Sequence, residues 1–543
     1  MPMQNVRTTP IEGQKPGTSG LRKKTAVFRR PHFLENYVQS IFDGTGGVEG
    51  KTLVIGGDGR FFNDAAIQII LRMACANSAA KCVVGQGGLL STPAASHLIR
   101  LRKADGGLIL SASHNPGGPD ADFGLKYNGP NGGPATEALT DKIYECTKTL
   151  VLYKIAAAED LDLHKLGSHK LENMVIEIVD PVADYADLMQ TIVDFPKIRQ
   201  LFADGFTMCF DAMHAVTGPY AHTVLEDMLG APKGTVINGQ PSPDFGKGHP
   251  DPNPIWAKTL MDKMHSADAP DFGAASDGDG DRNMIVGRGA YVTPSDSLAL
   301  LTAHAHLAPG YRDGLAGVAR SMPTSRAVDR VAESLGIGCF ETPTGWKFFG
   351  NLLDAGKVTL CGEESAGTGS DHVREKDGLW AVLLWLNILA ETGKSVSELM
   401  ADLWKAHGRC YYSRLDFEGV DSDKAMTMMD RLRAKLDGLA GSTIGGLTVA
   451  AADEFAYLDP VDGSQSTGQG IRITFAGDAR AVFRLSGTGT QGATIRLYLE
   501  QLETNTDRLQ EAPDAVLTAV RDAALTLSDL VAMTGRSTPD VIT

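Results

Sequence analysis

The stretch Ser111-Ala112-Ser113-His114-Asn115-Pro116-Gly117-Gly118 directly follows the apolar run Gly107-Leu108-Ile109-Leu110. A short β-prone run that stops at Asn-Pro-Gly-Gly predicts a buried strand that ends in a tight, exposed turn with Ser113 at its tip. Pro116 fixes its own φ and moves Asn115 out of the helical region, so we expect the far side of the turn to be stiff. A hydroxyl held there could accept and return a reacting group. The alternative is a surface turn whose polar side chains only cap the backbone.

The composition limits the class of protein. The chain has 543 residues, too many for one core, and a prior of about one domain per 150 residues predicts three or four domains. The hydrophobic fraction of 43% and the charged fraction of 22% are typical of a globular protein. A formal net charge of −15 argues against nucleic acid as a partner, although local arginines could still hold a small anion.

The cysteines and the apolar runs indicate the compartment. Seven scattered cysteines without a Cys-x-x-Cys indicate neither a disulfide framework nor a zinc site, and they favour a reducing cytoplasm. The N-terminal residues lack the apolar centre of a signal peptide. The most apolar run, residues 379–390, is too short to span a bilayer, so we interpret it as a core helix.

The first third of the chain alternates strands and helices. Residues 51–60 predict a strand that runs into a Gly-rich turn, residues 63–76 a helix, and residues 82–84 a further strand, which is an α/β pattern. We expect the first fifteen residues to be mobile and the Gly-rich loop that follows them to end in the cation of Arg22. Residues 123–128 would bring Lys126 to the edge that carries Ser113 if they pair as a strand. A solvated lysine is the alternative.

A second alternation starts near residue 189 and leads the strand 272–276 into Asp277-Gly-Asp-Gly-Asp-Arg282. On a straight strand the successive aspartates would lie about 6.6 Å apart. That is too far for Mg²⁺, whose oxygen ligands lie at about 2.0–2.1 Å. Gly278 and Gly280 allow the loop to curl until the carboxylates converge.

The other interpretations of this loop are a calcium site and a solvated turn. An EF-hand requires glycine where Arg282 stands and glutamate where Arg288 stands, so it is excluded. An acidic solvated turn stays open as the alternative. Because Mg²⁺ prefers few protein ligands plus a phosphate oxygen, the loop predicts a phosphoryl group beside it.

The segments that begin near residues 304 and 406 each contain a polar loop that could bind part of a substrate. A third alternation begins near residue 304 and leads to Glu363 and Ser365, which suit sugar hydroxyls, whereas the alternative is a helix capped by Ser365. From about residue 406 short strands and Gly-rich turns predict a separate α+β domain. There, residues 484–496 predict two strands joined by a Ser/Thr/Gly loop with an arginine on each strand, which suits a phosphate. The glycines of this loop are not followed by a helical pattern, which argues against a dinucleotide site.

Seven motifs in this order resemble those of the α-D-phosphohexomutases of the eukaryotic-like type. They lie at residues 15–22, 111–118, 277–284, 345–350, 361–365, 374–380 and 484–489. The resemblance implies an α/β fold of four domains around a central cleft, with three related α/β mixed-sheet domains followed by a smaller α+β C-terminal domain. We place the domains at residues 1–188, 189–303, 304–405 and 406–543, which carry the phosphoserine, Mg-binding, sugar-recognition and phosphate-binding loops in that order.

The resemblance also implies the site residues. The phosphoserine would be Ser113, and one Mg²⁺ per chain would be bound by its phosphate oxygen together with Asp277, Asp279 and Asp281. Charge stabilisation and proton transfer would fall to the catalytic residues Arg22, His114, Lys126 and Lys376. The expected substrate-binding residues are Arg282, Thr344, Gly345, Glu363, Ser365, Lys376, Arg484, Ser486, Gly487, Thr488, Thr490 and Arg496.

The implied reaction interconverts glucose 1-phosphate and glucose 6-phosphate. Phospho-Ser113 would phosphorylate the 6-hydroxyl, and the other phosphate of glucose 1,6-bisphosphate, an intermediate and activator, would return to the serine. The open alternatives are another phosphohexomutase such as a phosphomannomutase-like enzyme, a phosphatase, and a catalytically silent phosphosugar-binding relative. We expect a cytoplasmic monomer that acts on small phosphosugars and has no nucleic-acid or membrane partner.

Overall fold

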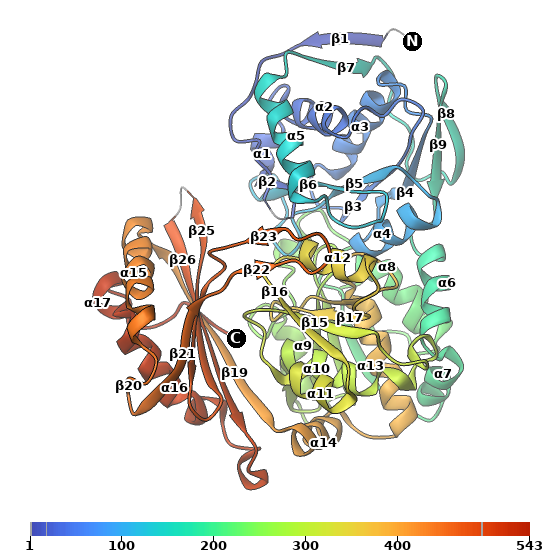
Figure 1. The fold of residues 1–543 in the computed structure, drawn as a ribbon. Coiled ribbons are helices and arrows are strands. Elements are labelled where there is room, and N and C mark those ends of the chain that lie inside the picture. The colour runs from blue at the N-terminus through green and yellow to red at the C-terminus, as the bar shows by residue number, and fades with distance from the viewer. Residues whose placement is uncertain (1–2, 18, 490–491) are drawn as a thin grey trace. The chain divides into compact units, whose positions relative to one another are not determined.

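The computed structural model describes residues 3–17, 19–489 and 492–543, without the side chains of residues 487–489. The chain forms two compact units (Figure 1). The first unit takes in the chain up to Pro294, His304–Gly317 and Gly345–Val396. The second takes in Ser295–Ala303, Val318–Thr344 and Ser397–Thr543.

A seven-stranded mixed sheet in the order β2-β6-β5-β3-β4-β9-β8 forms the centre of the N-terminal domain. The inner strands β5, β3, β4 and β9 run parallel, and the outer strands β2, β6 and β8 are antiparallel to their neighbours. The strands are β2 (Leu21–Lys24), β3 (Thr52–Gly57), β4 (Lys81–Leu89), β5 (Gly106–Leu110), β6 (Asp122–Asn128), β8 (Gly167–Leu171) and β9 (Met174–Val179). The predicted strands at residues 51–60, 82–84 and 123–128 correspond to β3, β4 and β6.

Helices cover both faces of this sheet (Figure 1). Side chains alternate across a strand, so Leu53 and Ile55 of β3 join the core beneath one layer of helices, whereas Gly107 of β5 faces Ile99 of the helix on the other side. The helices of this domain are α1 (Thr25–Phe28), α2 (Phe33–Gly44), α3 (Asn63–Ala76), α4 (Thr92–Leu101) and α5 (Glu137–Thr149). Helix α3 has the bounds that the sequence predicts.

The N-terminus differs from the prediction that the first fifteen residues are mobile. Strand β1 (Met3–Arg7) pairs antiparallel with β7 (Leu152–Ala156), with Met3 opposite Ala156. The strand is mostly exposed and has no apolar alternation. Its order therefore comes from backbone hydrogen bonds to a distant segment, which a local pattern does not reveal.

The next domain has a five-stranded mixed sheet in the order β11-β10-β12-β13-β14. Strand β10 (Met208–Asp211) runs parallel to β11 (Val236–Ile237) and β12 (Phe272–Ser276), so their carboxyl ends lie at one edge. Strands β13 (Asn283–Gly287) and β14 (Ala290–Val292) continue antiparallel. The helical segments are α6 (Ala183–Ile192), α7 (Phe195–Ala203), α8 (Thr217–Ala221), η1 (His222–Met228), η2 (Phe245–Lys247) and α9 (Lys258–Met264).

The rest of the first unit contains a short hairpin and a buried helix. Strands β17 (Leu360–Gly362) and β18 (Thr368–Ser370) pair antiparallel, and Ser365 lies between them, so the interpretation of Ser365 as a helix cap is wrong. The predicted core helix is confirmed as α13 (Gly378–Thr392), whose side chains are buried from Gly378 to Leu389. The other helical segments are η3 (Ala305–Leu307), η4 (Pro309–Tyr311) and α12 (Lys347–Asp354). Among the described helices none combines the length and apolarity that crossing a membrane requires.

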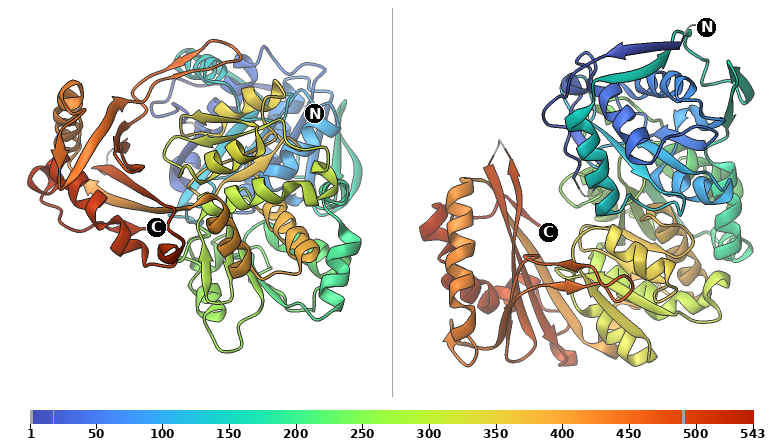
Figure 2. Two further views of the ribbon diagram at one scale, coloured as in Figure 1. Left: turned by 60° about the horizontal axis from the view of Figure 1, so that its bottom comes forward. Right: turned by 45° about the horizontal axis from the view of Figure 1, so that its top comes forward.

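The second unit is built around an antiparallel sheet in the order β20-β21-β24-β25-β26-β19-β27, against which α15 and α16 pack (Figure 2). Its strands are β19 (Arg409–Val420), β20 (Thr443–Ile444), β21 (Leu447–Glu454), β24 (Ile471–Phe475), β25 (Ala479–Gly489), β26 (Gly492–Glu503) and β27 (Val541–Ile542). The helices are α15 (Ser422–Lys435), η5 (Leu436–Gly438), η6 (Thr506–Arg508), α16 (Pro513–Ser528) and α17 (Leu530–Thr534). The other helices and strands that lie wholly or mostly in this unit are α10 (Pro294–His304), β15 (Gly317–Ser321), α11 (Ala327–Leu335), β16 (Gly338–Thr342), α14 (Val396–His407), β22 (Tyr457–Leu458) and β23 (Gln465–Ser466).

Candidate active site

Ser113 lies just beyond the carboxyl end of β5, in the turn that the sequence predicts. Its φ is 51°, a left-handed conformation that costs a non-glycine residue about 1–3 kcal/mol and persists only where the surroundings impose it. The turn is not exposed as expected, because Ser113 is only 3% accessible. The acidic loop after β12 covers it, so closely that a Cβ on Gly278 would lie 2.4 Å from the Ser113 carbonyl oxygen.

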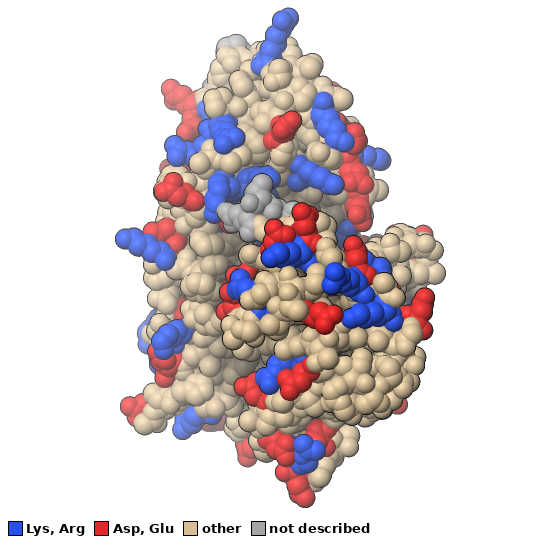
Figure 3. All heavy atoms as spheres, turned by 90° about the vertical axis from the view of Figure 1, so that its left-hand side faces the viewer, with Lys and Arg blue, Asp and Glu red and all other residues tan. Residues whose placement is uncertain are grey.

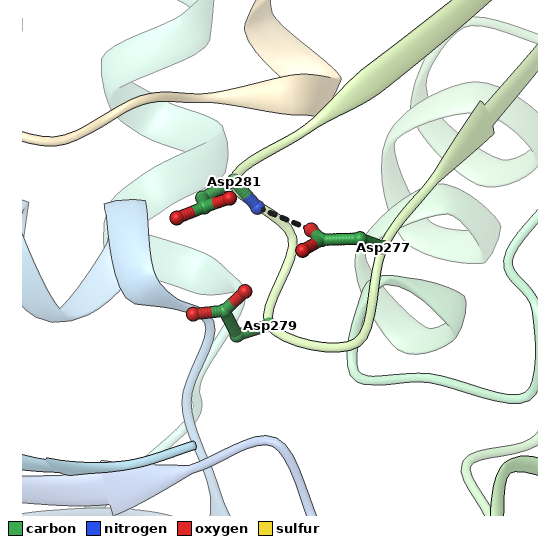
Figure 4. A group of neighbouring side chains, drawn as sticks. All are labelled: Asp277, Asp279 and Asp281. Atoms are coloured by element: carbon green, nitrogen blue, oxygen red, sulfur yellow. Dashed lines mark hydrogen bonds between the residues drawn. The ribbon is translucent and has the colours of Figure 1, made fainter. Parts of the chain in front are cut away.

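The three aspartates of the acidic loop converge as the glycines predict (Figure 4). One carboxylate oxygen from each of Asp277, Asp279 and Asp281 lies within 4.8 Å of the others, and all three residues are buried. Gly280 turns the loop with a φ of +81°. The loop is fixed by Asp277 Oδ1, which accepts hydrogen bonds from the backbone N–H groups of Asp281 at 2.9 Å and Arg282 at 3.0 Å. Asp277 Oδ2 accepts a 2.7 Å hydrogen bond from Ser113 Oγ, so the serine and the acidic trio form one site.

The donor set fits a small divalent cation. Asp279 Oδ1 and Asp281 Oδ1 are buried and have no hydrogen-bond partner among the described residues. Two oxygens on opposite sides of Mg²⁺ would lie about 4.2 Å apart, so the carboxylates need only a small inward shift. Burial together with the charges of Asp279 and Asp281 raises the pKa of Asp277 well above its usual value. A divalent cation among the three carboxylates would relieve this repulsion.

Two lysines place positive charge on the aspartates. Lys126 Nζ lies 3.1 Å from Glu375 Oε1 and 4.0 Å from Asp279 Oδ2, and Lys376 Nζ lies 3.3 Å from Asp281 Oδ2. Burial alone would lower the pKa of each lysine, but the neighbouring carboxylates outweigh it and raise both pKa values. Both side chains are therefore cations at neutral pH. In turn, the charge of Lys126, together with the hydrogen bond from Thr92 and the charge of Lys376, outweighs the effect of burial on Asp279 and holds the pKa of that carboxyl below its usual value.

Arg22, Arg282 and His114 complete the charged surroundings. Arg22 lies on β2, where burial lowers its pKa although Asp279 and Asp281 attract it. Arg282 Nη1 forms an ion pair with Asp251 Oδ1 at 3.1 Å. His114 Nδ1 lies 3.4 Å from Ser113 Oγ, and burial and the charge of Arg282 lower its pKa well below the usual value. The imidazole is therefore neutral at neutral pH.

The predicted sugar-contacting residues are partly brought together. Glu363 is buried, and its Oε1 accepts a 3.0 Å hydrogen bond from Gly345 N. Its charge also acts on Lys376. Ser365 is half-buried in the turn that follows β17. Thr344 belongs to the second unit, and its buried Oγ1 has no hydrogen-bond partner in the described part of the chain.

The predicted phosphate loop joins β25 and β26 of the second unit. Arg484 lies directly opposite Arg496 in the ladder, and Ser486 lies opposite Thr494. Arg496 Nε lies 3.7 Å from Asp416 Oδ2, and Arg484 Nε donates a 3.2 Å hydrogen bond to the carbonyl of Gln469, so Asp416 already offsets part of the positive charge of this pair. The two guanidinium groups can still bind an anion such as a phosphate. Thr490 and the side chains of Gly487 and Thr488 lie outside the described residues.

The sequence did not indicate several partners of the site. Thr92, the first residue of α4, donates a 2.6 Å hydrogen bond from its Oγ1 to Asp279 Oδ2. Glu375 accepts hydrogen bonds from Lys126 and, at 2.8 Å, from Asn128 Nδ2. The only feature of the sequence that could have pointed to Glu375 is its position next to Lys376. Thr92 stands in Ser-Thr-Pro, a pattern that also begins ordinary helices.

Family models match almost the whole chain. Three models of the description "Phosphoglucomutase/phosphomannomutase, alpha/beta/alpha domain" match, namely domain I at residues 13–154, domain II at 183–289 and domain III at 294–407. A fourth, "Phosphoglucomutase-1, C-terminal domain", matches residues 409–540. The predicted order of three α/β domains and a C-terminal domain is thereby confirmed, whereas the central cleft stays a prediction.

Proteins of about the same length are similar to the chain from end to end. A protein named "Phosphoglucomutase" from Rhizobium radiobacter is 59% identical over 100% of both chains. A "Probable phosphoglucomutase, cytoplasmic 2" from Arabidopsis thaliana is 51% identical over 99% of each chain. The solved open form of the Paramecium exocytosis-sensitive phosphoprotein parafusin, described as a phosphoglucomutase, is 46% identical, with a TM-score of 0.93 and coverage of 100% of this chain and 99% of that one.

Proposed function

The chain belongs to the phosphoglucomutase/phosphomannomutase family, and we propose that it interconverts glucose 1-phosphate and glucose 6-phosphate through phospho-Ser113. One observation carries the proposal: Ser113 Oγ lies 2.7 Å from Asp277, within a buried cluster of three convergent carboxylates. A phosphoryl group on that oxygen would face both the acidic trio and the surrounding cations.

The reaction has two phosphoryl transfers. First, the 6-hydroxyl oxygen of glucose 1-phosphate bonds to the phosphorus of phospho-Ser113 as the bond from phosphorus to Ser113 Oγ breaks. The hydroxyl proton passes to the site and Oγ receives one, which leaves a free serine and glucose 1,6-bisphosphate. The bisphosphate then reverses its orientation, and Ser113 Oγ bonds to the phosphorus at the 1-position as the bond from that phosphorus to the 1-oxygen breaks. The serine hydroxyl gives up its proton and the 1-oxygen receives one, so that glucose 6-phosphate is released and phospho-Ser113 is regenerated.

The chain supplies the electrostatics for both transfers. A phosphoserine carries about −1.5 to −2 charges, which add to those of the three aspartates. Arg22, Lys126 and Lys376 would offset this charge, and His114 next to Ser113 Oγ can take part in proton transfer. Asp277, Asp279, Asp281 and a phosphate oxygen of Ser113 would hold Mg²⁺. When bound, the ion would neutralise charge that develops on the transferred group.

Recognition of the sugar and of its second phosphate is assigned to separate loops. We assign the sugar hydroxyls to Glu363 and Ser365, near Gly345 and Thr344, and Arg282 to the phosphosugar. The phosphate that is not transferred would be held by the loop of the second unit, with Arg484, Ser486, Gly487, Thr488, Thr490 and Arg496. We propose domain bounds at 1–188, 189–303, 304–405 and 406–543, so that each domain carries one of the four loops.

The partners follow from the same chemistry. On the face drawn in Figure 3, basic and acidic side chains are interspersed, which is typical of a solvated surface rather than of a nucleic-acid-binding stripe. We propose a monomer that acts on small phosphosugars in the cytoplasm. Glucose 1,6-bisphosphate would serve as its intermediate and activator.

The test is a coupled assay of glucose 6-phosphate formation from glucose 1-phosphate, with and without added glucose 1,6-bisphosphate. We expect activity that depends on Mg²⁺, increases with the bisphosphate and is lost in Ser113→Ala. Activity that survives this substitution would refute the proposal. Release of inorganic phosphate instead of glucose 6-phosphate would identify a phosphatase, and faster turnover of mannose 1-phosphate a phosphomannomutase-like enzyme.

A further inference from the structure

The ion pair between Asp58 and Arg60, at the end of the neighbouring strand, holds the backbone of Ser113: the N–H through Ser111 and the carbonyl directly. Ser113 N donates a 2.7 Å hydrogen bond to Ser111 Oγ, whose own hydroxyl donates a 2.6 Å hydrogen bond to Asp58 Oδ2. On the other side of the residue, Arg60 Nη2 donates a 2.7 Å hydrogen bond to the carbonyl oxygen of Ser113. The hydrogen bonds of the Ser113 N–H and carbonyl therefore lead to Asp58 and Arg60, respectively.

The ion pair itself is rigid and completely enclosed. The side chains of Asp58 and Arg60 are 0% exposed, and Arg60 Nε contacts both carboxylate oxygens of Asp58 at 3.0 and 2.9 Å. Asp58 directly follows β3, and its N–H donates to the carbonyl of Leu110 at the end of β5. Because β3 and β5 run parallel, the pair lies at the same sheet edge as the Ser113 turn.

A loop of the next domain braces the pair from outside. The guanidinium carbon of Arg60 lies 5.2 Å from the centre of the Phe245 ring, and Phe61 N donates a 2.8 Å hydrogen bond to the carbonyl of Pro243. A Cβ on Gly117 would lie 2.7 Å from that same carbonyl oxygen. Arg60 therefore has little room to move away from the turn.

We propose that Asp58, Arg60 and Ser111 form a clamp of positioning residues that imposes the left-handed conformation of Ser113 and so sets the direction of its Oγ. The proposal rests on the function proposed above. Without the clamp, Ser113 would relax toward ordinary φ values, because nothing intrinsic to serine favours a φ of 51°. Its Oγ would then move away from Asp277 Oδ2, from which it lies 2.7 Å. In both half-reactions the phosphorus must meet the same oxygen, so both depend on this direction.

The clamp predicts a specific kinetic signature. A 1 Å misplacement of a reacting atom costs about 100-fold in rate. In Ser111→Ala we therefore expect kcat to fall about 100-fold while the KM for glucose 1-phosphate changes less than about twofold, because the groups that bind the sugar are untouched. Ser111→Thr keeps the hydroxyl and is expected to retain most of the kcat.

A matched control separates this effect from the loss of any buried serine hydroxyl. Ser40 in α2 is completely buried and donates a 2.7 Å hydrogen bond to the carbonyl of Asn36, outside the site. Ser40→Ala is expected to keep the wild-type kcat and KM.

A second measurement, hydrogen exchange of the Ser113 amide by mass spectrometry, does not depend on turnover. We expect faster exchange in Ser111→Ala than in the wild type or Ser40→Ala.

Each outcome either supports or overturns the proposed clamp. A loss of kcat and faster exchange in Ser111→Ala, both reversed in Ser111→Thr, would support the clamp. An unchanged kcat, an equal loss in Ser111→Thr, or unchanged amide exchange would overturn it. A wild-type protein without mutase activity would overturn the proposed function instead, and the exchange experiment would still decide whether the clamp holds the Ser113 turn.

Discussion

Replacing Lys126 with methionine should destabilise the first unit strongly, because the substitution leaves Glu375 as a buried carboxylate without its ion-pair partner. The Lys126 side chain is 10% exposed and that of Glu375 only 2%, with 3.1 Å between the charged atoms. At an effective dielectric constant of about 20, two unit charges at this distance attract each other by about 5 kcal/mol. Part of this attraction offsets the desolvation of Lys126. We therefore expect Lys126→Met to cost about 3–5 kcal/mol in the free energy of unfolding.

The double variant isolates the uncompensated charge. Glu375→Gln removes the charge but still accepts the hydrogen bond from Asn128, so Lys126→Met with Glu375→Gln should be more stable than Lys126→Met alone.

The stability of Lys126→Met should also depend on pH in a definite direction. Burial already raises the pKa of Glu375, and the loss of Lys126 raises it further. Because the folded-state pKa exceeds the unfolded-state value, the stability of Lys126→Met should increase as the pH falls through that folded-state pKa.

The measurement is urea unfolding, followed by circular dichroism at several pH values, of the wild type, Lys126→Met, the double variant Lys126→Met with Glu375→Gln, and Lys148→Met. Lys148→Met is the matched control, because Lys148 pairs with Glu145 in an exposed position, and we expect its urea midpoint to equal that of the wild type. The reasoning is refuted if Lys126→Met unfolds at the wild-type midpoint, or if the added Glu375→Gln substitution destabilises it further.

Three further outcomes test the surroundings of the acidic trio. Thr92→Val removes the 2.6 Å hydrogen bond to Asp279, and Mg²⁺ affinity measured by calorimetry should fall about 10- to 100-fold, whereas equal affinity would show that this bond does not orient the ligand. Mg²⁺ at 100 times its dissociation constant should stabilise the wild type by about 2.7 kcal/mol, and the rise in melting temperature should disappear in Asp279→Asn or on chelation. Tyr185→Phe removes the 2.8 Å hydrogen bond to buried Asp377 and should cost about 1–3 kcal/mol, visible as a lower melting temperature with unchanged Mg²⁺ affinity.

The parts of the site that follow from short segments were predictable. Strand β5 and the turn after it come from an apolar run followed by Asn-Pro-Gly-Gly, and the convergence of the aspartates comes from glycines between them. Helix α13 likewise follows from a continuous apolar run. In each case the deciding interactions lie within a few residues, so the local pattern carries the information.

Only the tertiary structure decided which distant groups meet these segments. Thr92 and Asp279 are 187 residues apart, and Lys126 and Glu375 are 249 apart. Strand β1 became ordered, and Ser113 became buried, for the same reason: a remote segment covers or pairs with each of them. The amino-acid sequence by itself determined where a reactive hydroxyl and a cation-binding loop occur, since turn and glycine chemistry is local. How that hydroxyl is aimed, and how its buried charges are balanced, depended on folding, because Coulomb and hydrogen-bond energies depend on distance in space and not on separation along the chain.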